Sequence, residues 1–583
     1  MLEGAYESTV IRPPDESGLN AFRQRSIVVN CTQPTPHPMV RCSGWIVDRE
    51  SDAVNWLPVI GLVLLIPALF LNLGVNPLFA VNDEAIRILV SQEMKLSGDY
   101  LTPTTFGEPY LNKPPLFNWL VMLSSELSGS YTEFSLRLVS VLSLLGFGLL
   151  VFHYASKQFT RPVAVFLAFA LVTTGRILYF DSFLGLIDIT HGMVVFWNFM
   201  LIYHLFHRRK FLGMFVVSYA LTAAAFFLKG LPALVFQGIT LSVFFWMEGR
   251  FRMLFSWRHA AGILVLLIPV VTYYFFYSLR NELSFGELFT VLVDQSTQRT
   301  GMQHGLKRSL EHFVSFPFEW IYHFAPWTLL GITLIRKGSL QRIGRHPFLR
   351  YCGVIFLANV SVYWLSPGVF ARYFFMMVPL VLMIFAFFYT QEKEQGSNAW
   401  QIRAVEWTFM FFVLAGTFML PILPLIGVMG RDPLVWLKLM TIWVPLLAIS
   451  ILLLKWKAHR LMLTVLAFLL FRVAFNFFVL PERAAAEARY LDGVRGVARA
   501  AEGSPLYIFK NNYLLQEADV FYINQDRGEM LVRKHEGFTT RELYLVDDRQ
   551  YDPAKFELLY QYACKWYDRP IRVCRIREGA DLR

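Results

Sequence analysis

Long apolar runs separated by short polar stretches dominate the sequence between residues 56 and 480. A helix needs about 17 to 25 predominantly apolar residues to cross the hydrocarbon core of a bilayer. About thirteen runs meet this length, so the pattern predicts an α-helical polytopic membrane protein. The predicted spans are residues 56–74, 134–153, 162–180, 183–206, 211–228, 231–247, 260–279, 316–335, 349–365, 371–390, 404–424, 434–454 and 458–480.

Two regions before the second span depart from this pattern. Residues 1–53 are polar, contain several prolines and lack the arrangement of a cleavable signal, so we predict a cytoplasmic tail there and a transmembrane domain over 54–480. The loop 76–133 contains two short amphipathic stretches, 83–96 and 116–127. We expect these stretches to be helices that lie in the membrane interface with their apolar faces towards acyl chains.

After residue 480 the composition becomes that of a soluble protein, which predicts a small α/β domain over 481–583. Helical periodicity marks one segment, and Asp552-Pro553 is a typical helix start, whereas short apolar runs favour strands. The predicted helices are 485–501 and 552–563, and the predicted strands are 506–509, 520–523, 543–546 and 571–576.

Composition supports the membrane assignment and removes one class of partner. The chain of 583 residues is 55% hydrophobic and 16% aromatic, more apolar surface than a soluble core of that size would hide. Its net charge of +11 lies mainly in loops between spans, as in other membrane proteins, so we do not expect nucleic acid as a partner.

The distribution of basic residues predicts the orientation of the chain. The loops after even-numbered spans hold eighteen lysines and arginines, whereas the short loops on the other side hold only Lys229, Arg372 and Arg431. Because basic loops remain in the cytoplasm, the N-terminus is predicted to be cytoplasmic and the C-terminal domain external. Cys564 and Cys574 would then lie in an oxidising compartment, where a disulfide between them is one of two open alternatives.

On this topology the unusual charges gather at one face of the membrane. Asp83, Glu84 and Lys113 lie in the first external loop, Asp181 and Asp188 flank a later external turn, and others lie in the loop 280–315. Charged groups near a bilayer are costly, so their default interpretation is a working site. The alternative is an ordinary polar loop.

A site that transfers a sugar from a lipid phosphate needs a carboxylate to accept the proton of the acceptor hydroxyl. Asp83 or Glu84 is the candidate. The same pair is also a candidate for a divalent cation, but two carboxylates without a third ligand make this the weaker alternative, and we expect no metal.

Such a site also needs cations to neutralise the departing phosphate. Lys113, Arg299 and Arg372 are candidates, together with the hydroxyls of Tyr110 and Tyr373. Taken alone, Arg372 and Tyr373 also fit an interfacial anchor.

Asp188 and His191 lie three positions apart on one helical face and are candidates for support of the site. The alternative is that they bond to each other or to Arg176.

The first external loop resembles that of a known family. The order Asp83-Glu84, Gly98-Asp99, Pro103 and then 110–116 (YLNKPPL) is similar to the bacterial aminoarabinose transferases and the wider protein-mannosyltransferase-like superfamily of C-type glycosyltransferases, as is the later element 366–373. The resemblance covers about residues 56–390 and implies Asp83 as the base and Lys113 and Arg372 as donor-phosphate contacts. Asn112 and Asp294-Gln295 depart from the transferase pattern, which leaves the sugar and the acceptor open.

The resemblance implies a glycosyltransferase of the bacterial inner membrane. Its donor would be a sugar on an undecaprenyl-phosphate-like polyprenyl phosphate, and its acceptor a cell-envelope molecule such as lipopolysaccharide, another glycan or a protein. The main alternative is a transporter or flippase of lipid-linked sugar. Transporters often show repeated halves with interrupted helices, and the sequence shows no such repeat. A membrane sensor would leave the segment 83–115 unexplained.

Overall fold

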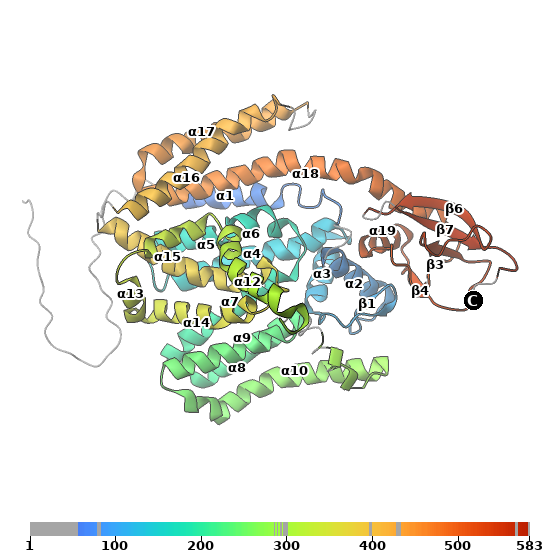
Figure 1. The fold of residues 1–583 in the computed structure, drawn as a ribbon, viewed down its shortest axis with the longest axis horizontal. Coiled ribbons are helices and arrows are strands. Elements are labelled where there is room, and N and C mark those ends of the chain that lie inside the picture. The colour runs from blue at the N-terminus through green and yellow to red at the C-terminus, as the bar shows by residue number, and fades with distance from the viewer. Residues whose placement is uncertain are drawn as a thin grey trace, which may run out of the picture. The chain divides into compact units, whose positions relative to one another are not determined.

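The computed structural model describes residues 56–78, 83–284, 286–288, 290–291, 294, 301–395, 399–426, 433–565 and 569–580, except for the side chains of 301–304 and 306. Residues 55–583 form one compact unit. The predicted tail 1–53 and Arg299 lie outside the described residues. Figure 1 shows a bundle of helices followed by the long helix α18, which leads to the C-terminal sheet.

Most of the predicted spans are long apolar helices. Among the described residues, eight helices are long and apolar enough to cross a membrane, or nine if the bent pair α5 and α6 is counted as one span. These helices are α4 (Glu133–Ala155), α5 (Arg161–Val172) with α6 (Gly175–Tyr179), α7 (Ile187–His207), α8 (Phe211–Lys229), α10 (Trp257–Asn281), α15 (Val378–Glu394), α16 (Trp400–Met419), α17 (Val435–Lys455) and α18 (Arg460–Ala500). The polytopic α-helical class is thus confirmed.

The remaining predicted spans are shorter or interrupted helices. Two are apolar but short, α1 (Leu57–Phe70) and α9 (Pro232–Met247), and α14 (Pro347–Trp364) falls short in apolarity. The segment 316–335 divides between α12 (Gly301–His323) and the 3-10 helix η4 (Trp327–Leu334) because Pro326 interrupts it. The number of about thirteen spans therefore stays a prediction.

The first loop contains both predicted helices, α2 (Asp83–Ser97) and α3 (Leu116–Ser128), with the short strands β1 (Thr104–Thr105) and β2 (Glu108–Pro109) between them. Pro115 ends the linker and is the N-cap of α3. The prediction that α2 turns its apolar face to acyl chains is wrong. Ile88, Leu89 and Val90 are fully buried because α2 packs against α3 and against α19 of the C-terminal domain.

The C-terminal domain is a five-stranded mixed sheet in the order β4-β3-β5-β7-β6. β3 pairs in parallel with β4 and β5, whereas β7 pairs antiparallel with β5 and β6. The elements are β3 (Leu506–Phe509), α19 (Glu517–Arg527), β4 (Val532–Lys534), β5 (Leu543–Val546), β6 (Phe556–Ala563) and β7 (Pro570–Ile576). The predicted α/β domain is confirmed, and its leading helix is the end of α18.

Two predictions inside this domain are wrong. Residues 520–523 belong to α19, which begins with a capping box between Gln516 and Asp519, and a short apolar run does not distinguish a buried helix from a strand. The predicted helix after Asp552 is instead β6, which pairs with β7 along seven positions. Long-range pairing decides this segment, and no local pattern reports it.

The structure contains no disulfide between Cys564 and Cys574, both of which it describes. The Cys564 thiol donates to the Leu514 carbonyl at 3.4 Å. Cys574 lies in the core of the sheet beside Phe509 and Tyr544. The alternative with two separate thiols is therefore the one observed.

Candidate functional site

A chain of ion pairs connects Asp83, Arg372, Asp188 and Lys229. Arg372 Nη2 donates to Asp83 Oδ2 at 2.6 Å, and Arg372 Nε lies 3.0 Å from Asp188 Oδ2. Lys229 Nζ forms an ion pair with the other carboxylate oxygen of Asp188. The Asp83 side chain is 44% exposed, whereas the other three are at most 10% exposed. Asp83 is therefore the accessible end of an otherwise buried network.

Four segments far apart in the sequence bring these charges together. Asp83 and Asp188 lie in the first turns of α2 and α7, and Lys229 is the last residue of α8. Acidic side chains are favoured at helix N-termini and basic ones at C-termini, so the helix dipoles stabilise this arrangement. Arg372 enters from the 3-10 helix η5 (Ala371–Met377). All four segments had been predicted to lie at one face of the membrane.

Aromatic rings surround the cations of this network. Lys229 Nζ lies 3.5 Å from the ring centroid of Tyr373, and Arg372 Cζ lies 4.6 Å from that of Phe370. Tyr373 is therefore close to the network, as its place beside Arg372 predicted. Cation–π contacts of this kind are strongest where water is scarce.

Lys113 lies near the start of α7 in space, because its charge acts on His191, one turn into that helix. His191 is 2% exposed, and its Nε2 has no hydrogen-bond partner among the described residues. Asp188 bonds to Arg372 and Lys229, while Arg176 pairs with Asp181 at 2.9 Å. The alternative pairing of Asp188 with Arg176 is therefore not observed.

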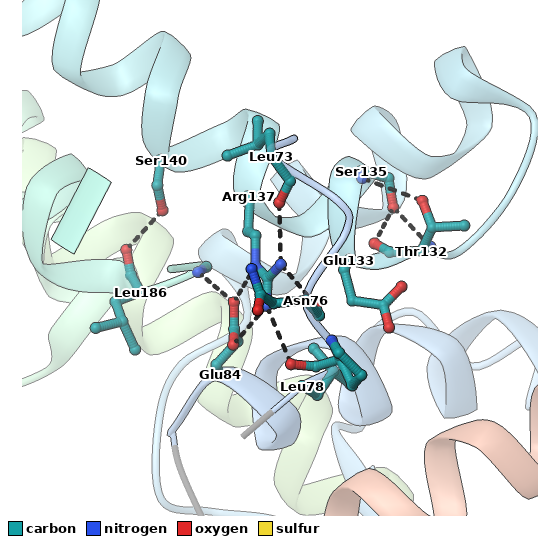
Figure 2. Close-up of polar contacts among 12 residues, drawn as sticks. Leu73, Asn76, Leu78, Glu84, Thr132, Glu133, Ser135, Arg137, Ser140 and Leu186 are labelled. Atoms are coloured by element: carbon teal, nitrogen blue, oxygen red, sulfur yellow. Dashed lines mark hydrogen bonds and ion pairs between the residues drawn. The ribbon is translucent and has the colours of Figure 1, made fainter. Parts of the chain in front are cut away.

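Glu84 is fully buried and belongs to a separate set of polar contacts around Arg137 (Figure 2). Its Oε1 accepts from Arg137 Nε at 2.8 Å and from the Gly185 amide at 2.8 Å, and its Oε2 accepts from Arg137 Nη2 at 3.2 Å. Arg137 also donates to the carbonyls of Leu73 and Asn76. This arrangement fastens α2 to α4 and favours a structural role for Glu84.

Tyr110 contacts α2 directly. Its hydroxyl accepts from Arg87 Nη2 at 2.8 Å, and its ring packs near Val90 and Met122. Burial raises the pKa of the Tyr110 hydroxyl. The Arg87 charge lowers this pKa, and the Asp83 charge raises it. Tyr110 is therefore within electrostatic range of Asp83.

Lys229 is a member of the site that the sequence pattern did not predict. In the sequence, Lys229 is only one of three basic residues in the external loops. A lysine at the external end of an apolar helix was the available signal, because basic residues are rare on that side. The predicted candidate Arg299 lies outside the described residues.

The geometry also bears on a cation at Asp83 and Glu84. The two carboxylates pair with different arginines, Arg372 and Arg137. In the part of the chain that the structure describes, no three His, Cys, Asp or Glu side chains lie close enough to hold a metal ion. These residues give a metal no ready set of ligands, and the expectation of a metal-free enzyme stays a prediction.

Comparison with known proteins places the chain beside lipid-dependent sugar transferases. The family model described as dolichyl-phosphate-mannose-protein mannosyltransferase matches residues 112–275. An undecaprenyl phosphate-alpha-4-amino-4-deoxy-L-arabinose arabinosyl transferase of Shewanella sediminis is 31% identical over 147 residues, 24% of this chain and 25% of the relative. An uncharacterized protein of Aquifex aeolicus is 24% identical over 274 residues, 45% of this chain and 53% of that protein. The matches thus span about half or less of these relatives.

The fold is that of a solved membrane transferase. The crystal structure of ArnT from Cupriavidus metallidurans bound to undecaprenyl phosphate superimposes with a TM-score of 0.64 at 18% identity, covering 91% of this chain and all of that one. The apo form gives 0.62 over 92% of this chain. The predicted resemblance to aminoarabinose transferase-like and protein-mannosyltransferase-like proteins is therefore confirmed. At this identity the superposition shows the shared fold.

Proposed function

We propose that this protein is an integral membrane glycosyltransferase that moves a sugar from a polyprenyl-phosphate donor to a cell-envelope acceptor. One observation carries the proposal: a half-exposed carboxylate, Asp83, lies at the open end of a buried cluster of cations. A transporter has no need of a base at such a position. The matching family model and the Shewanella sediminis relative bear the names of transferases of lipid-linked sugars, which supports the same class.

The charges of the site suit a donor with one phosphodiester. Arg372 and Lys229 pair with two carboxylates, Asp83 and Asp188, and Lys113 adds a third cation whose charge acts on the neighbouring His191. One positive charge therefore remains to match the single negative charge of a sugar phosphodiester. As the sugar–phosphate bond breaks, the phosphate gains charge, and guanidinium and ammonium groups stabilise it most strongly in a site that excludes water.

Asp83 is the proposed general base. In the reaction the acceptor hydroxyl oxygen forms a bond to the anomeric carbon, the bond from that carbon to the phosphate oxygen breaks, and the hydroxyl proton moves to Asp83. The polyprenyl phosphate leaves with the bonding electrons. Arg372 holds Asp83 at 2.6 Å and is also the proposed phosphate contact, so it would fix the base beside the reacting carbon. Glu84 takes no part in these steps.

The location we propose is the bacterial inner membrane, with the site at its periplasmic face. The basic loops support a cytoplasmic N-terminus and a periplasmic C-terminal domain. Cysteine-accessibility labelling of engineered sites near residues 20 and 540 tests this orientation. Labelling of both from the same side would contradict it.

The direct test of the function is transfer by purified protein in lipid. Extracted polyprenyl-phosphate sugars and candidate acceptors (lipid A, a glycan or a protein) are incubated with the protein, and glycosylated product is identified by its mass. The proposal expects product without added metal. A flippase of lipid-linked sugar, the second candidate, would instead move the donor between leaflets and give no product.

A further inference from the structure

The segment that carries Lys113 begins with a short hairpin held between two parts of the protein. β1 and β2 form this hairpin over residues 104–109, and Lys113 follows five positions after Glu108. Lys113 is a proposed donor contact, yet the chain around it has no helix or long strand of its own. The contacts that hold the hairpin therefore determine the position of the Lys113 ammonium group.

Helix α2 holds one side of the hairpin through Glu93. This carboxylate is fully buried and accepts from the Phe106 amide at 2.8 Å, the Gly107 amide at 3.2 Å and the Thr104 hydroxyl at 2.8 Å. Three donors on one carboxylate fix the tip of the hairpin relative to α2, because leaving any of them unpaired in a buried place would cost free energy.

Strand β4 of the C-terminal domain holds the other side. The Arg533 amide donates to the Phe106 carbonyl at 2.9 Å, and Arg533 Nη1 pairs with Glu108 Oε2 at 2.7 Å. His535 Nε2 lies 2.8 Å from the other oxygen of Glu108. The Arg533 side chain is 17% exposed and that of Glu108 41%, and the guanidinium also lies 5.0 Å from the Phe106 ring centroid.

The hairpin and strand β4 approach each other closely at Gly107. Gly107 has φ +76°, and a Cβ added there would lie 2.8 Å from Val532 Cγ1. Both the positive φ and the short distance require glycine. The hairpin and β4 therefore meet in a specific arrangement.

The connection from the hairpin to Lys113 is also fixed. The Tyr110 amide donates to the Pro103 carbonyl at 2.7 Å, and its hydroxyl is held by Arg87. Leu111 packs against a cluster that includes Tyr273 and Tyr277 of α10. Pro114 and Pro115, on the far side of Lys113, are buried. A displacement of the hairpin would therefore also displace Lys113.

The C-terminal domain also contacts α2, the helix that begins with Asp83. α19 packs on α2, and the Gln92 side chain donates to the Phe521 carbonyl at 3.3 Å. At the start of α19, burial raises the pKa of Glu517, while the Arg87 charge lowers it and Asp83 raises it. The C-terminal domain therefore reaches both the loop of Lys113 and the helix that begins with Asp83 (Figure 1).

We propose that the C-terminal α/β domain is a positioning part of the donor site, and that Arg533 acts on Glu108 to set the place of Lys113. This inference rests on the proposed function. Arg533 and Glu108 touch no reacting atom in this account and act through Lys113. The alternative is that the Glu108–Arg533 pair only attaches the C-terminal domain to the hairpin. Loss of the pair would then change the stability of the protein and leave its donor affinity intact.

The experiment measures KM for the extracted lipid-linked sugar and kcat in Glu108→Gln, Arg533→Gln and the charge-reversed double variant Glu108→Arg/Arg533→Glu. We expect the single variants to raise KM for the donor roughly three- to thirtyfold with kcat within about twofold. The double variant should recover part of this loss. The matched control removes the Asp548–Arg572 pair inside the same domain, a 2.8 Å pair with similar exposure, and should leave KM unchanged.

A double-mutant cycle separates positioning from attachment. The cycle uses undecaprenyl phosphate as the binding probe and measures its affinity for each variant. If Glu108 acts through Lys113, Glu108→Gln in a Lys113→Ala background causes no further loss of this affinity. Parental KM in the single variants, or additive losses in the cycle, would overturn the inference while leaving the transferase intact. Absence of transfer by the parent protein would instead overturn the proposed function.

Discussion

Asp83 and Glu84 are neighbours in the sequence, and each pairs with one arginine, yet their surroundings differ completely. Glu84 and Arg137 are buried, and their polar atoms bond to each other and to backbone groups of Leu73, Asn76 and Gly185. Asp83 keeps 44% of its side chain exposed beside Arg372. The same pair of residue types therefore gives one structural clamp and one accessible carboxylate, and burial decides which is which.

The two arginine–carboxylate pairs should differ most in what they contribute to stability. Arg137→Ala leaves the Glu84 carboxylate buried without its cation, and loss of one partner of a buried pair costs about 3–5 kcal/mol. Asp83→Asn should change stability by less than about 1 kcal/mol, because Asp83 is half-exposed and Arg372 keeps its ion pair with Asp188. Unfolding midpoints in detergent measure both. Equal losses of stability for the two variants would contradict the division of roles.

The next effect concerns the donor. Lys113→Gln and Arg372→Gln should each weaken binding of the lipid-linked donor, since a hydrogen bond to a charged group contributes roughly 1.5–3 kcal/mol. Affinity for undecaprenyl phosphate measured by titration in detergent checks this. Arg280→Gln, which removes the exposed pair with Asp99 on the same loop, is the control. Loss of affinity in the control alone would place the phosphate elsewhere.

A pH effect of similar or smaller size is expected at the hairpin. Burial raises the pKa of Glu93 to about 7, although its three hydrogen-bond donors act in the opposite direction. A raised pKa means that the folded state binds the proton more tightly than the unfolded state. The contribution to stability is therefore present below about pH 4.5 and is lost as the pH rises towards 7.

Glu93→Gln removes this dependence. Between pH 4.5 and 7 the free energy of unfolding of the parent should fall relative to the variant by roughly 1–3 kcal/mol. Parallel pH profiles of the two proteins would show that Glu93 does not titrate in this range. The comparison is made with urea or thermal unfolding at each pH.

The apolar pattern was sufficient to predict most of the membrane part. Most of the long apolar runs are α-helical, because a helix satisfies its backbone hydrogen bonds within the run itself in a bilayer. The same reasoning failed in the C-terminal domain, where residues 520–523 are helical and 556–563 form a strand. Those outcomes depend on pairing with β7 and packing on α2, which are contacts between distant segments.

The candidate site likewise has residues that the sequence predicts and residues that only the fold brings together. Asp83, Arg372 and Asp188 were predicted because charges at helix ends in a membrane protein are unusual and the parity of the spans put them on one face. Tyr373 was predicted as the hydroxyl beside Arg372. The sequence offered no means of separating Asp83 from Glu84, since only the fold brings Arg137 and Gly185 to one of them. Lys229 was overlooked because nothing in the sequence connects α8 with Asp188.

The role of Asp83 as general base is tested most directly by single-turnover transfer by Asp83→Asn, with donor affinity measured on the same preparation. Asparagine keeps the size of the side chain but accepts no proton, so transfer should fall by about a hundredfold or more while the donor still binds. Glu84→Gln serves as the companion variant, and a correctly folded fraction of it should transfer at close to the parent rate. Transfer by Asp83→Asn at the parent rate would show that Asp83 is not the base and would contradict the account.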